Sequence, residues 1–341
     1  MAAQSFFRRR FWGFGIGAGL LGLLILTVRY ALRPPRKSQL PDNIFPAIFA
    51  TRILYTAKGE LVYHESGQGN PLIFLHGVYP GASSYEWSRI YPHFADRFQV
   101  LAPDLVGFGE SARPNRPLTA ADHATVLAEF LKAKTGEGRV TIVASGLGAA
   151  FAVLLSVQHP ELVQRLVLLM PVGLTERGAK RYVGRGRWVS AIPFLNQIYY
   201  RRFLATRAQI RAWLATFAFF DSDRIDDEIV EVLYSFAHQF GAERAVFRSA
   251  NNKLQVDLSE RLTELIQPVT LIWGQNAVFP PIRSAYELQR LPPQCTLVLV
   301  EECGILAPLE VPQELKRILD RELEYRIRLH DVGIGRVNGE R

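Results

Sequence analysis

Apolar and polar positions divide this chain into an apolar N-terminal run, a proline-rich stretch and a long segment of alternating short and long patterns. The first run covers residues 11–28 and contains no charge. As an α-helix rising about 1.5 Å per residue, it would be about 27 Å long, barely enough to cross the core of a bilayer. Trp12 and Tyr30 stand near its ends, where amphipathic rings prefer the membrane interface. Seven cations and no acid flank it within residues 1–37, namely Arg8, Arg9, Arg10, Arg29, Arg33, Arg36 and Lys37.

We therefore predict that residues 1–32 form a membrane anchor with a single spanning helix over 11–28. A cleaved signal peptide is the main alternative, but no small-x-small cleavage site follows the apolar run. Three cations precede the helix and four follow it, so the side of the membrane stays open. Residues 33–50 contain four prolines among polar residues, which predicts a stiff linker between the anchor and the rest of the chain.

The remaining chain alternates short apolar runs with longer helical patterns. A hairpin is expected over residues 53–65, across Lys58-Gly59. Buried strands and helices then alternate, which predicts an α/β fold with a mostly parallel, doubly wound sheet and ligands at the carboxyl ends of its strands. The expected strands are 72–75, 99–102, 140–143, 165–169, 269–273 and 296–300, and the expected helices are near 84–95, 119–134, 148–158, 282–290 and 311–325.

The segment from 172 to 260 interrupts this alternation, because it is long, helical in composition and rich in arginine and aromatic residues. We interpret it as a helical lid inserted into a core formed by residues 51–171 and 261–329. Residues 330–341 are expected to form a flexible tail.

The net charge of +8 is concentrated in two places. Residues 1–37 carry +7 and residues 176–211 carry +8, whereas the rest of the chain carries −7. The basicity therefore does not indicate a diffuse nucleic-acid surface, and no nucleic-acid-binding motif accompanies it. The lid cations either pair with the acidic run at 221–231 or face anionic lipid headgroups. The candidate membrane-surface residues are Arg177, Lys180, Arg181, Arg185, Arg187, Trp188, Arg201 and Arg202.

Several motifs follow the predicted strands in a characteristic order. They are Leu75-His76-Gly77, DLVGFGES at 104–111, VASGLGA at 143–149, RLVLLMP at 165–171, LIWG at 271–274 and Cys303-Gly304. Together they resemble the α/β-hydrolase fold family over about residues 50–325. The resemblance implies a mostly parallel eight-stranded sheet with flanking helices and a helical lid. It also implies that His76, Gly77, Val78 and Leu147 form the pocket and oxyanion loop, with a structural role for His76.

The same resemblance implies a nucleophile on a sharp turn between strand and helix, at the centre of G-x-S-x-G. One register centres on Ser145 but puts a valine and a leucine two residues away on either side. The other register centres on Gly146, with the small residues Ala144 and Gly148 at those positions. Only the second fits a turn that brings these positions close together. We therefore assign the nucleophile position to Gly146.

The other two positions of the family's catalytic triad also lack suitable side chains. The acid position, three residues after Trp273-Gly274, holds Ala277, and the base position after Cys303-Gly304 holds Ile305. Glycine, alanine and isoleucine can neither attack a carbonyl nor transfer a proton. This predicts a pseudo-hydrolase that acts as a binding, scaffold or assembly module at a membrane. Its expected partners are the bilayer and either a membrane protein or a hydrophobic small molecule, and no nucleic acid.

Two alternatives remain open. The first is an active serine hydrolase, esterase- or lipase-like, that cleaves a lipid or ester with the displaced residues Ser145 and His238. The second is a hydrolase-fold receptor that senses a small hydrophobic ligand. No Cys/His cluster has metal-ligand spacing and no phosphate-binding glycine loop is present, so we expect neither a metal nor a cofactor.

Overall fold

The computed structural model describes residues 45–333, apart from 137, 174–196, 250–253 and 255. Eight strands form one sheet in the order β1-β2-β4-β3-β5-β6-β7-β8. The pairs β1/β2 and β2/β4 are antiparallel, and the other pairs are parallel. The predicted hairpin and the six predicted buried strands are confirmed. The strands are β1 Ala50–Thr56, β2 Gly59–Ser66, β3 Pro71–Leu75, β4 Gln99–Pro103, β5 Val140–Ser145, β6 Val163–Leu169, β7 Val269–Gly274 and β8 Cys295–Val300.

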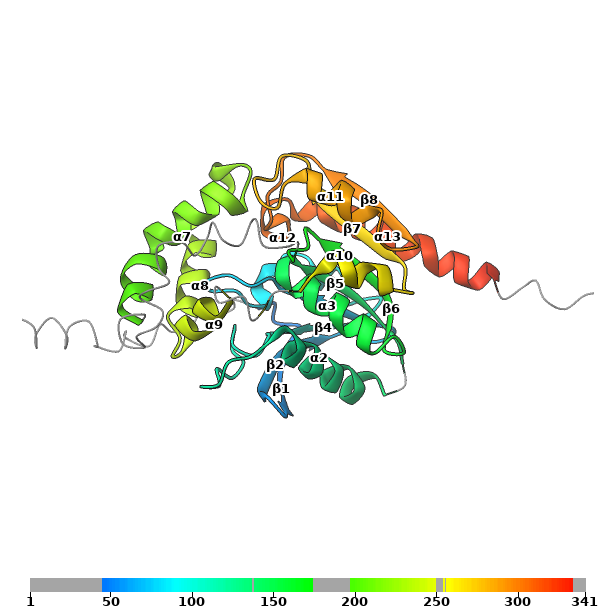
Figure 1. Ribbon diagram of the computed structural model, residues 1–341, viewed down its shortest axis with the longest axis horizontal. Helices are drawn as coiled ribbons and strands as arrows, with labels where there is room; N and C mark the ends of the chain where they lie inside the picture. Colours follow the sequence, from blue (N-terminus) through cyan, green and yellow to red (C-terminus); the bar gives the residue numbers. More distant parts are fainter. Residues whose placement is uncertain (1–44, 137, 174–196, 250–253, 255, 334–341) are drawn as a thin grey trace, which may run out of the picture.

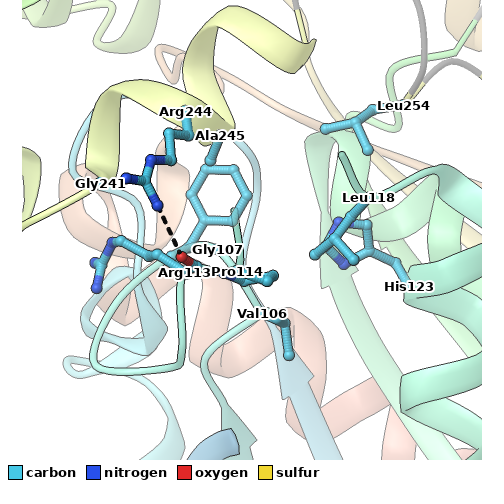
Figure 2. Close-up of a pocket in the computed structure, with 11 residues that line it drawn as sticks. Val106, Gly107, Arg113, Pro114, Leu118, His123, Gly241, Arg244, Ala245 and Leu254 are labelled. Atoms are coloured by element: carbon cyan, nitrogen blue, oxygen red, sulfur yellow. Dashed lines mark hydrogen bonds between the residues drawn. The ribbon is translucent and has the colours of Figure 1, made fainter. Parts of the chain in front are cut away.

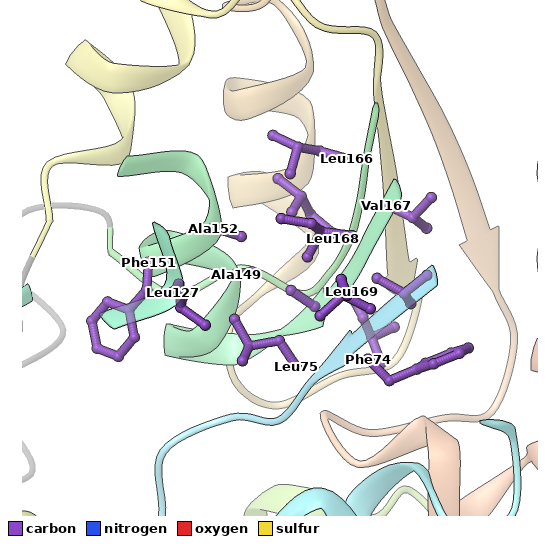
Figure 3. Close-up of a cluster of buried hydrophobic side chains, with 14 of the residues drawn as sticks. Phe74, Leu75, Leu127, Ala149, Phe151, Ala152, Leu166, Val167, Leu168 and Leu169 are labelled. Atoms are coloured by element: carbon purple, nitrogen blue, oxygen red, sulfur yellow. The ribbon is translucent and has the colours of Figure 1, made fainter. Parts of the chain in front are cut away.

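Helices cover both faces of this sheet. Consecutive side chains of a strand point to opposite faces, so neighbouring apolar residues of one strand pack against different helices. On one face, Leu75 of β3 lies with Leu127 and Ala149, which come from two helices (Figure 3). On the other face, the Phe74 ring lies 5.4 Å from the Trp87 ring and within 6.3 Å of two further aromatic rings. The core helices are α2 Ala120–Thr135, α3 Gly146–Gln158, α10 Leu258–Arg261, α11 Ile282–Gln289, α12 Ala307–Glu310 and α13 Pro312–Gly333, with short 3-10 helices η1 Ser84–Trp87, η2 Tyr91–Phe94 and η6 Leu262–Glu264.

Two helix boundaries differ from the predictions. The single helix expected near 84–95 is instead η1 followed by η2, and Pro92 stands at the start of η2. Proline lacks an N–H and clashes with the preceding turn, so a continuous α-helix cannot run through this position. At the other end of the chain, α13 extends to Gly333, past the expected end of the helix near residue 325 and into the segment 330–341 that was expected to be a tail. A buried ion pair, in which Arg165 of β6 donates to Glu322 at 2.6 Å, holds α13 against the sheet.

The described part of the lid is helical, as predicted. Its helices lie beside the sheet rather than on it (Figure 1) and enclose a hydrophobic cluster of their own, to which Leu306 and Leu309 contribute. The Asp226 side chain accepts the backbone N–H of Ile229 and so caps the start of α8. The elements are η3 Tyr200–Leu204, α7 Arg207–Trp213, η4 Leu214–Ala218, η5 Ser222–Arg224, α8 Asp227–Ala237 and α9 Ala242–Ser249.

Four predicted segments lie wholly or partly outside the described residues. These are the anchor with its helix over 11–28, residues 33–44 of the linker, residues 334–341 of the tail, and the lid segment with six of the eight candidate membrane-surface residues, from Arg177 to Trp188. Within the part of the chain that the structure describes, no helix is both long and apolar enough to cross a membrane.

Candidate active site

The predicted turn between β5 and α3 is present. Ser145 ends β5 with φ −118° and ψ 154°, and Gly146 follows with φ +51°. A positive φ is costly for residues other than glycine, and family nucleophiles sit on such a strained turn. Two residues on, a Cβ added to Gly148 would lie only 2.1 Å from the carbonyl oxygen of His76. The turn is therefore centred on Gly146, and the requirement for a small residue two positions later is met by Gly148.

Gly146 and Ile305 lie close together at the carboxyl edge of the sheet. A Cβ added to Gly146 would lie 3.7 Å from Cα of Gly77 and 4.0 Å from Cδ1 of Ile305. These are ordinary van der Waals distances, so the turn has room for a side chain. Ala277 lies in the loop after β7, is half-buried and packs against the main core. The side chains at these three positions are apolar or absent.

The loop after β3 runs beside the turn, because Leu75 pairs with Ala144 in the sheet. His76 in this loop is fully buried. Its Nε2 accepts the backbone N–H of Leu105 at 2.9 Å, so Nδ1 carries the proton and donates to the carbonyl of Gly77 at 2.6 Å. Burial lowers the pKa of His76. His76 therefore holds the loop in place, as expected. Val78 of this loop and Leu147 after the turn are both half-buried and pack against the core.

Glu86 of η1 lies beneath the turn, a position that the sequence did not reveal. Its Oε1 accepts a hydrogen bond from the Ser145 hydroxyl, and its Oε2 accepts from the Gly77 N–H at 2.9 Å and the Tyr79 hydroxyl at 3.0 Å. The residue is 1% exposed. Burial raises the pKa of Glu86 to about 7, against the opposing effect of the three donors. One carboxyl thus links the oxyanion loop to the end of β5.

The two displaced residues of the hydrolase alternative have separate partners. The Ser145 hydroxyl donates to Glu86, as described above. His238 follows α8, and its Nδ1 lies 2.9 Å from the carbonyl of Tyr234, whose ring centroid is 4.0 Å from its own. Burial lowers the pKa of His238. Ser145 and His238 do not form the hydrogen-bonded pair that this alternative requires.

The lid is hydrogen-bonded to the loop that carries Ile305. The carboxylate of Glu310 accepts three backbone N–H groups, from Gly304 at 2.7 Å, Phe220 at 2.7 Å and Asp221 at 2.9 Å. On the other side of the turn, the Tyr79 ring stacks on Trp213 of α7, with centroids 5.2 Å apart. The lid therefore contacts the two loops that flank the turn, the loop after β3 and the loop that carries Ile305.

Four cations of the basic segment 176–211 lie within the described residues. Arg207 donates to Glu231 at 2.7 and 2.8 Å, and Arg211 donates to Asp227. Pairing with the acidic run therefore accounts for these two arginines. Arg201 and Arg202 belong to η3, where Arg202 is exposed and the next residue, Phe203, is 61% exposed.

A small cavity lies between the loop after β4 and α9 of the lid (Figure 2). Its volume of about 20 Å³ is about that of one water molecule. Arg244 donates across it to the carbonyl of Arg113 at 3.4 Å. His123 lines its inner end and stacks on Phe151 at 4.6 Å, and burial lowers the pKa of this histidine to about 4. The cavity is too small for an organic substrate.

The sheet order, the turn after β5 and the helical lid define a protein of the α/β-hydrolase class. The model of the alpha/beta hydrolase fold family matches residues 70–311, and the chain belongs to this family.

Curated relatives and a solved structure cover most of the chain. A 2-hydroxymuconate semialdehyde hydrolase of Pseudomonas sp. (strain CF600) is 32% identical over 72% of this chain and 84% of its own length. A 2-hydroxy-6-oxo-6-(2'-aminophenyl)hexa-2,4-dienoic acid hydrolase of Metapseudomonas resinovorans is 26% identical over 78% of this chain and 88% of its own. The crystal structure of a serine hydrolase involved in carbazole degradation has a TM-score of 0.69 and 24% identity, and covers 81% of this chain and 99% of that one.

Proposed function

We propose that this chain is a membrane-anchored α/β-hydrolase-family protein that lacks the family's serine chemistry and serves as a binding or assembly module. The observation that carries the proposal is Gly146 at the left-handed position of the turn, with Ile305 beside it. At that position the family's chemistry needs an attacking oxygen or sulfur, and beside it a base. Neither residue supplies one.

The apolar character of the site supports a hydrophobic small molecule as its ligand. Gly77 and the Ile305 side chain are the nearest neighbours of an added Cβ at Gly146, and apolar walls with few polar groups are typical of small-molecule sites. The hydrogen bonds that Glu310 accepts from backbone N–H groups of the lid also support a coupling between an occupied site and the lid surface.

Hydrolysis is the second candidate, and the names of the relatives favour it. Both curated relatives described above are hydrolases. The residues that would carry this chemistry are Ser145 and Glu86 rather than Ser145 and His238, because the Ser145 hydroxyl donates to Glu86. A carboxyl with a pKa near neutrality is suited to accept a proton. However, Ser145 is only 1% exposed and lies in strand conformation before the turn.

A fluorophosphonate probe and a panel of p-nitrophenyl esters separate the two candidates. We expect the unmodified protein to show neither labelling nor turnover. Labelling that Ser145→Ala abolishes would overturn the binding-module proposal in favour of hydrolysis. Ser156→Ala is the matched control, since Ser156 is also buried but donates to a backbone carbonyl within α3.

A second pair of variants tests whether the turn could hold a nucleophile. Gly146→Ser restores the hydroxyl, and Gly146→Ser with Ile305→His restores a nucleophile and a base together. We expect the probe to label the double variant, because the turn has room for the serine side chain. Two controls locate the labelled residue. One adds Ser145→Ala to the double variant, and the other carries Ile305→His with Gly146→Ala in place of Gly146→Ser. If the first lost the label as completely as the second, the assignment of the nucleophile position to Gly146 would be wrong.

The membrane part of the proposal rests on the sequence of residues 1–37 and on the basic lid. Each cation near an anionic surface contributes about 1 kcal/mol of attraction. We expect the full chain to stay in the membrane fraction after alkaline extraction. We also expect chain 45–341 to bind vesicles containing phosphatidylglycerol. A variant of this chain with glutamate in place of Arg181, Arg185 and Arg187 should bind them more weakly. Equal binding of both forms at low salt would discard the basic lid as a membrane surface.

A further inference from the structure

Three potential metal ligands meet on the antiparallel side of the sheet, away from Gly146. His64 lies on β2, whereas Asp104 and Glu110 belong to the loop after β4. One imidazole nitrogen and one oxygen of each carboxylate all lie within 4.8 Å of one another. The distance from Nε2 of His64 to Oε2 of Glu110 is 3.8 Å.

The His64 ring has one satisfied nitrogen and one without a partner. The residue is fully buried, and its ring stacks on Phe45 with centroids 3.6 Å apart. Nδ1 lies 3.1 Å from the hydroxyl oxygen of Thr51, whereas the buried Nε2 has no hydrogen-bond partner. A buried polar atom without a partner is uncommon in native proteins and needs an explanation. Here the atom faces two carboxyl groups.

The two carboxyl groups are held close together by the backbone. Oδ1 of the buried Asp104 accepts the N–H of Ser84 at 2.6 Å, and its Oδ2 accepts the N–H of Glu110 at 2.7 Å. Each carboxylate oxygen has a second lone pair that can still bind a cation. Two carboxylates this close to one another repel, and a cation between them would remove this repulsion.

We propose that His64, Asp104 and Glu110 bind one divalent transition-metal ion of the Zn²⁺ or Mn²⁺ type. An imidazole nitrogen with two carboxylates is a ligand set for such ions. Donor atoms around one zinc ion lie about 3–4 Å apart, and the His64–Glu110 distance falls within this range. The Thr51 hydroxyl at Nδ1 fixes the ring orientation, as outer partners of metal-binding histidines commonly do.

The metal ion would clamp the loop after β4 to strand β2. The Glu110 side chain is 31% exposed, so the ion can enter from solvent past this residue. Three protein ligands leave further positions to water. The site is independent of the residue at Gly146, so it stands whether or not the chain has hydrolase activity.

Metal content and thermal stability test this proposal. The purified full-length chain is stripped with a chelator, given Zn²⁺ or Mn²⁺, separated from excess metal by gel filtration and analysed by mass spectrometry for bound metal. We expect about one Zn²⁺ per chain and a higher unfolding midpoint with zinc, with weaker binding of Mn²⁺. In Glu110→Gln and in His64→Gln, zinc affinity should fall at least about tenfold and the rise in midpoint should be lost.

His93→Gln is the control, because His93 also pairs with a carboxylate, Asp320 at 2.8 Å, but on the surface. It should bind zinc like the unmodified chain. Circular dichroism of the metal-free variants shows that loss of binding is not loss of folding, and Glu110→Gln keeps the test valid if His64→Gln does not fold. Two results would overturn the proposal. One is unmodified protein that holds much less than one zinc ion per chain after gel filtration, and the other is Glu110→Gln that still holds one.

Discussion

Replacing Glu86 by glutamine should stabilise the protein at neutral and alkaline pH. Burial raises the pKa of Glu86 from 4.5 to about 7 in the folded chain. A carboxyl whose pKa is higher in the folded state binds more protons there, so its contribution to stability is complete below about pH 4.5 and is lost as the pH rises to about 7. The difference of about 2.5 between the pKa values, at about 1.36 kcal/mol each, corresponds to about 3 kcal/mol.

Glutamine imitates the protonated form of this residue. Its carbonyl oxygen can accept from the Gly77 N–H and the Tyr79 hydroxyl, and its amide can donate to the Ser145 hydroxyl oxygen. The free energy of unfolding, measured by urea titration with circular dichroism, should differ least between the two proteins at about pH 4, below the pKa of the unfolded-state carboxyl. Above pH 7, Glu86→Gln should be the more stable by about 3 kcal/mol.

Two further variants make the Glu86 experiment decisive. Glu301→Gln makes the same substitution at an exposed position after β8, and it should change the free energy of unfolding at pH 8 by no more than about 0.5 kcal/mol. Ser145→Ala removes a donor that lowers the pKa of Glu86, so the pH at which stability declines should move upward. A glutamine variant that is less stable at pH 8, or a difference that is constant with pH, would refute the reasoning.

Gly148→Ala should destabilise the fold by about 3 kcal/mol or more in thermal unfolding, because its Cβ would lie 2.1 Å from the carbonyl oxygen of His76. Gly146→Ala, with its nearest contact at 3.7 Å, should cost only the strain of φ +51°, about 1–2 kcal/mol, so equal losses would contradict the geometry of the turn. Glu322→Gln removes the carboxylate to which the guanidinium of Arg165, whose side chain is 7% exposed, donates at 2.6 Å. We expect a loss of about 3 kcal/mol in urea unfolding, and one below about 0.5 kcal/mol would mean that the ion pair behaves like a surface pair.

Most of the sheet could be predicted from the sequence because its strands are short, apolar and separated by helical patterns. The order of the strands within the sheet was not predicted from the residues, because it depends on which strands pair and not on their local patterns. The segment 84–95 failed because its apolar spacing fits a helix, whereas the effect of Pro92 on backbone hydrogen bonding divides it into two short helices. The apolar spacing there favours one helix, but the missing N–H and the ring of Pro92 prevent a continuous helix.

The turn at Gly146 could also be located from the sequence, because only small residues fit two positions away from its centre. Glu86 could not be found in this way, since one glutamate in a helical pattern usually faces solvent. A signal was present, however. Glu86 stands between Tyr85 and Trp87, and all three are buried in the structure. The cluster around His64 was missed because its members come from strand β2 and the loop after β4, which only the fold brings together.

The pattern of charges along the lid predicted some of its ion pairs. Pairing with the acidic run was one of two interpretations, and it accounts for Arg207 and Arg211, whose partners lie on the adjacent helix α8. The cations from Arg177 to Arg187 lie outside the described residues, so the membrane surface stays a prediction there.

The turn at Gly146 keeps its shape through contacts that need no catalytic side chain. The carbonyl of Gly146 accepts the N–H of Val172 at 3.0 Å, and Gly148 packs against the carbonyl of His76. Glu86 fixes the loop opposite through the Gly77 N–H. A serine at the centre would add backbone strain of about 1–2 kcal/mol that glycine avoids. Glycine at position 146 should therefore make the folded chain more stable than serine would by about 1–2 kcal/mol, and thermal unfolding of Gly146→Ser measures this difference.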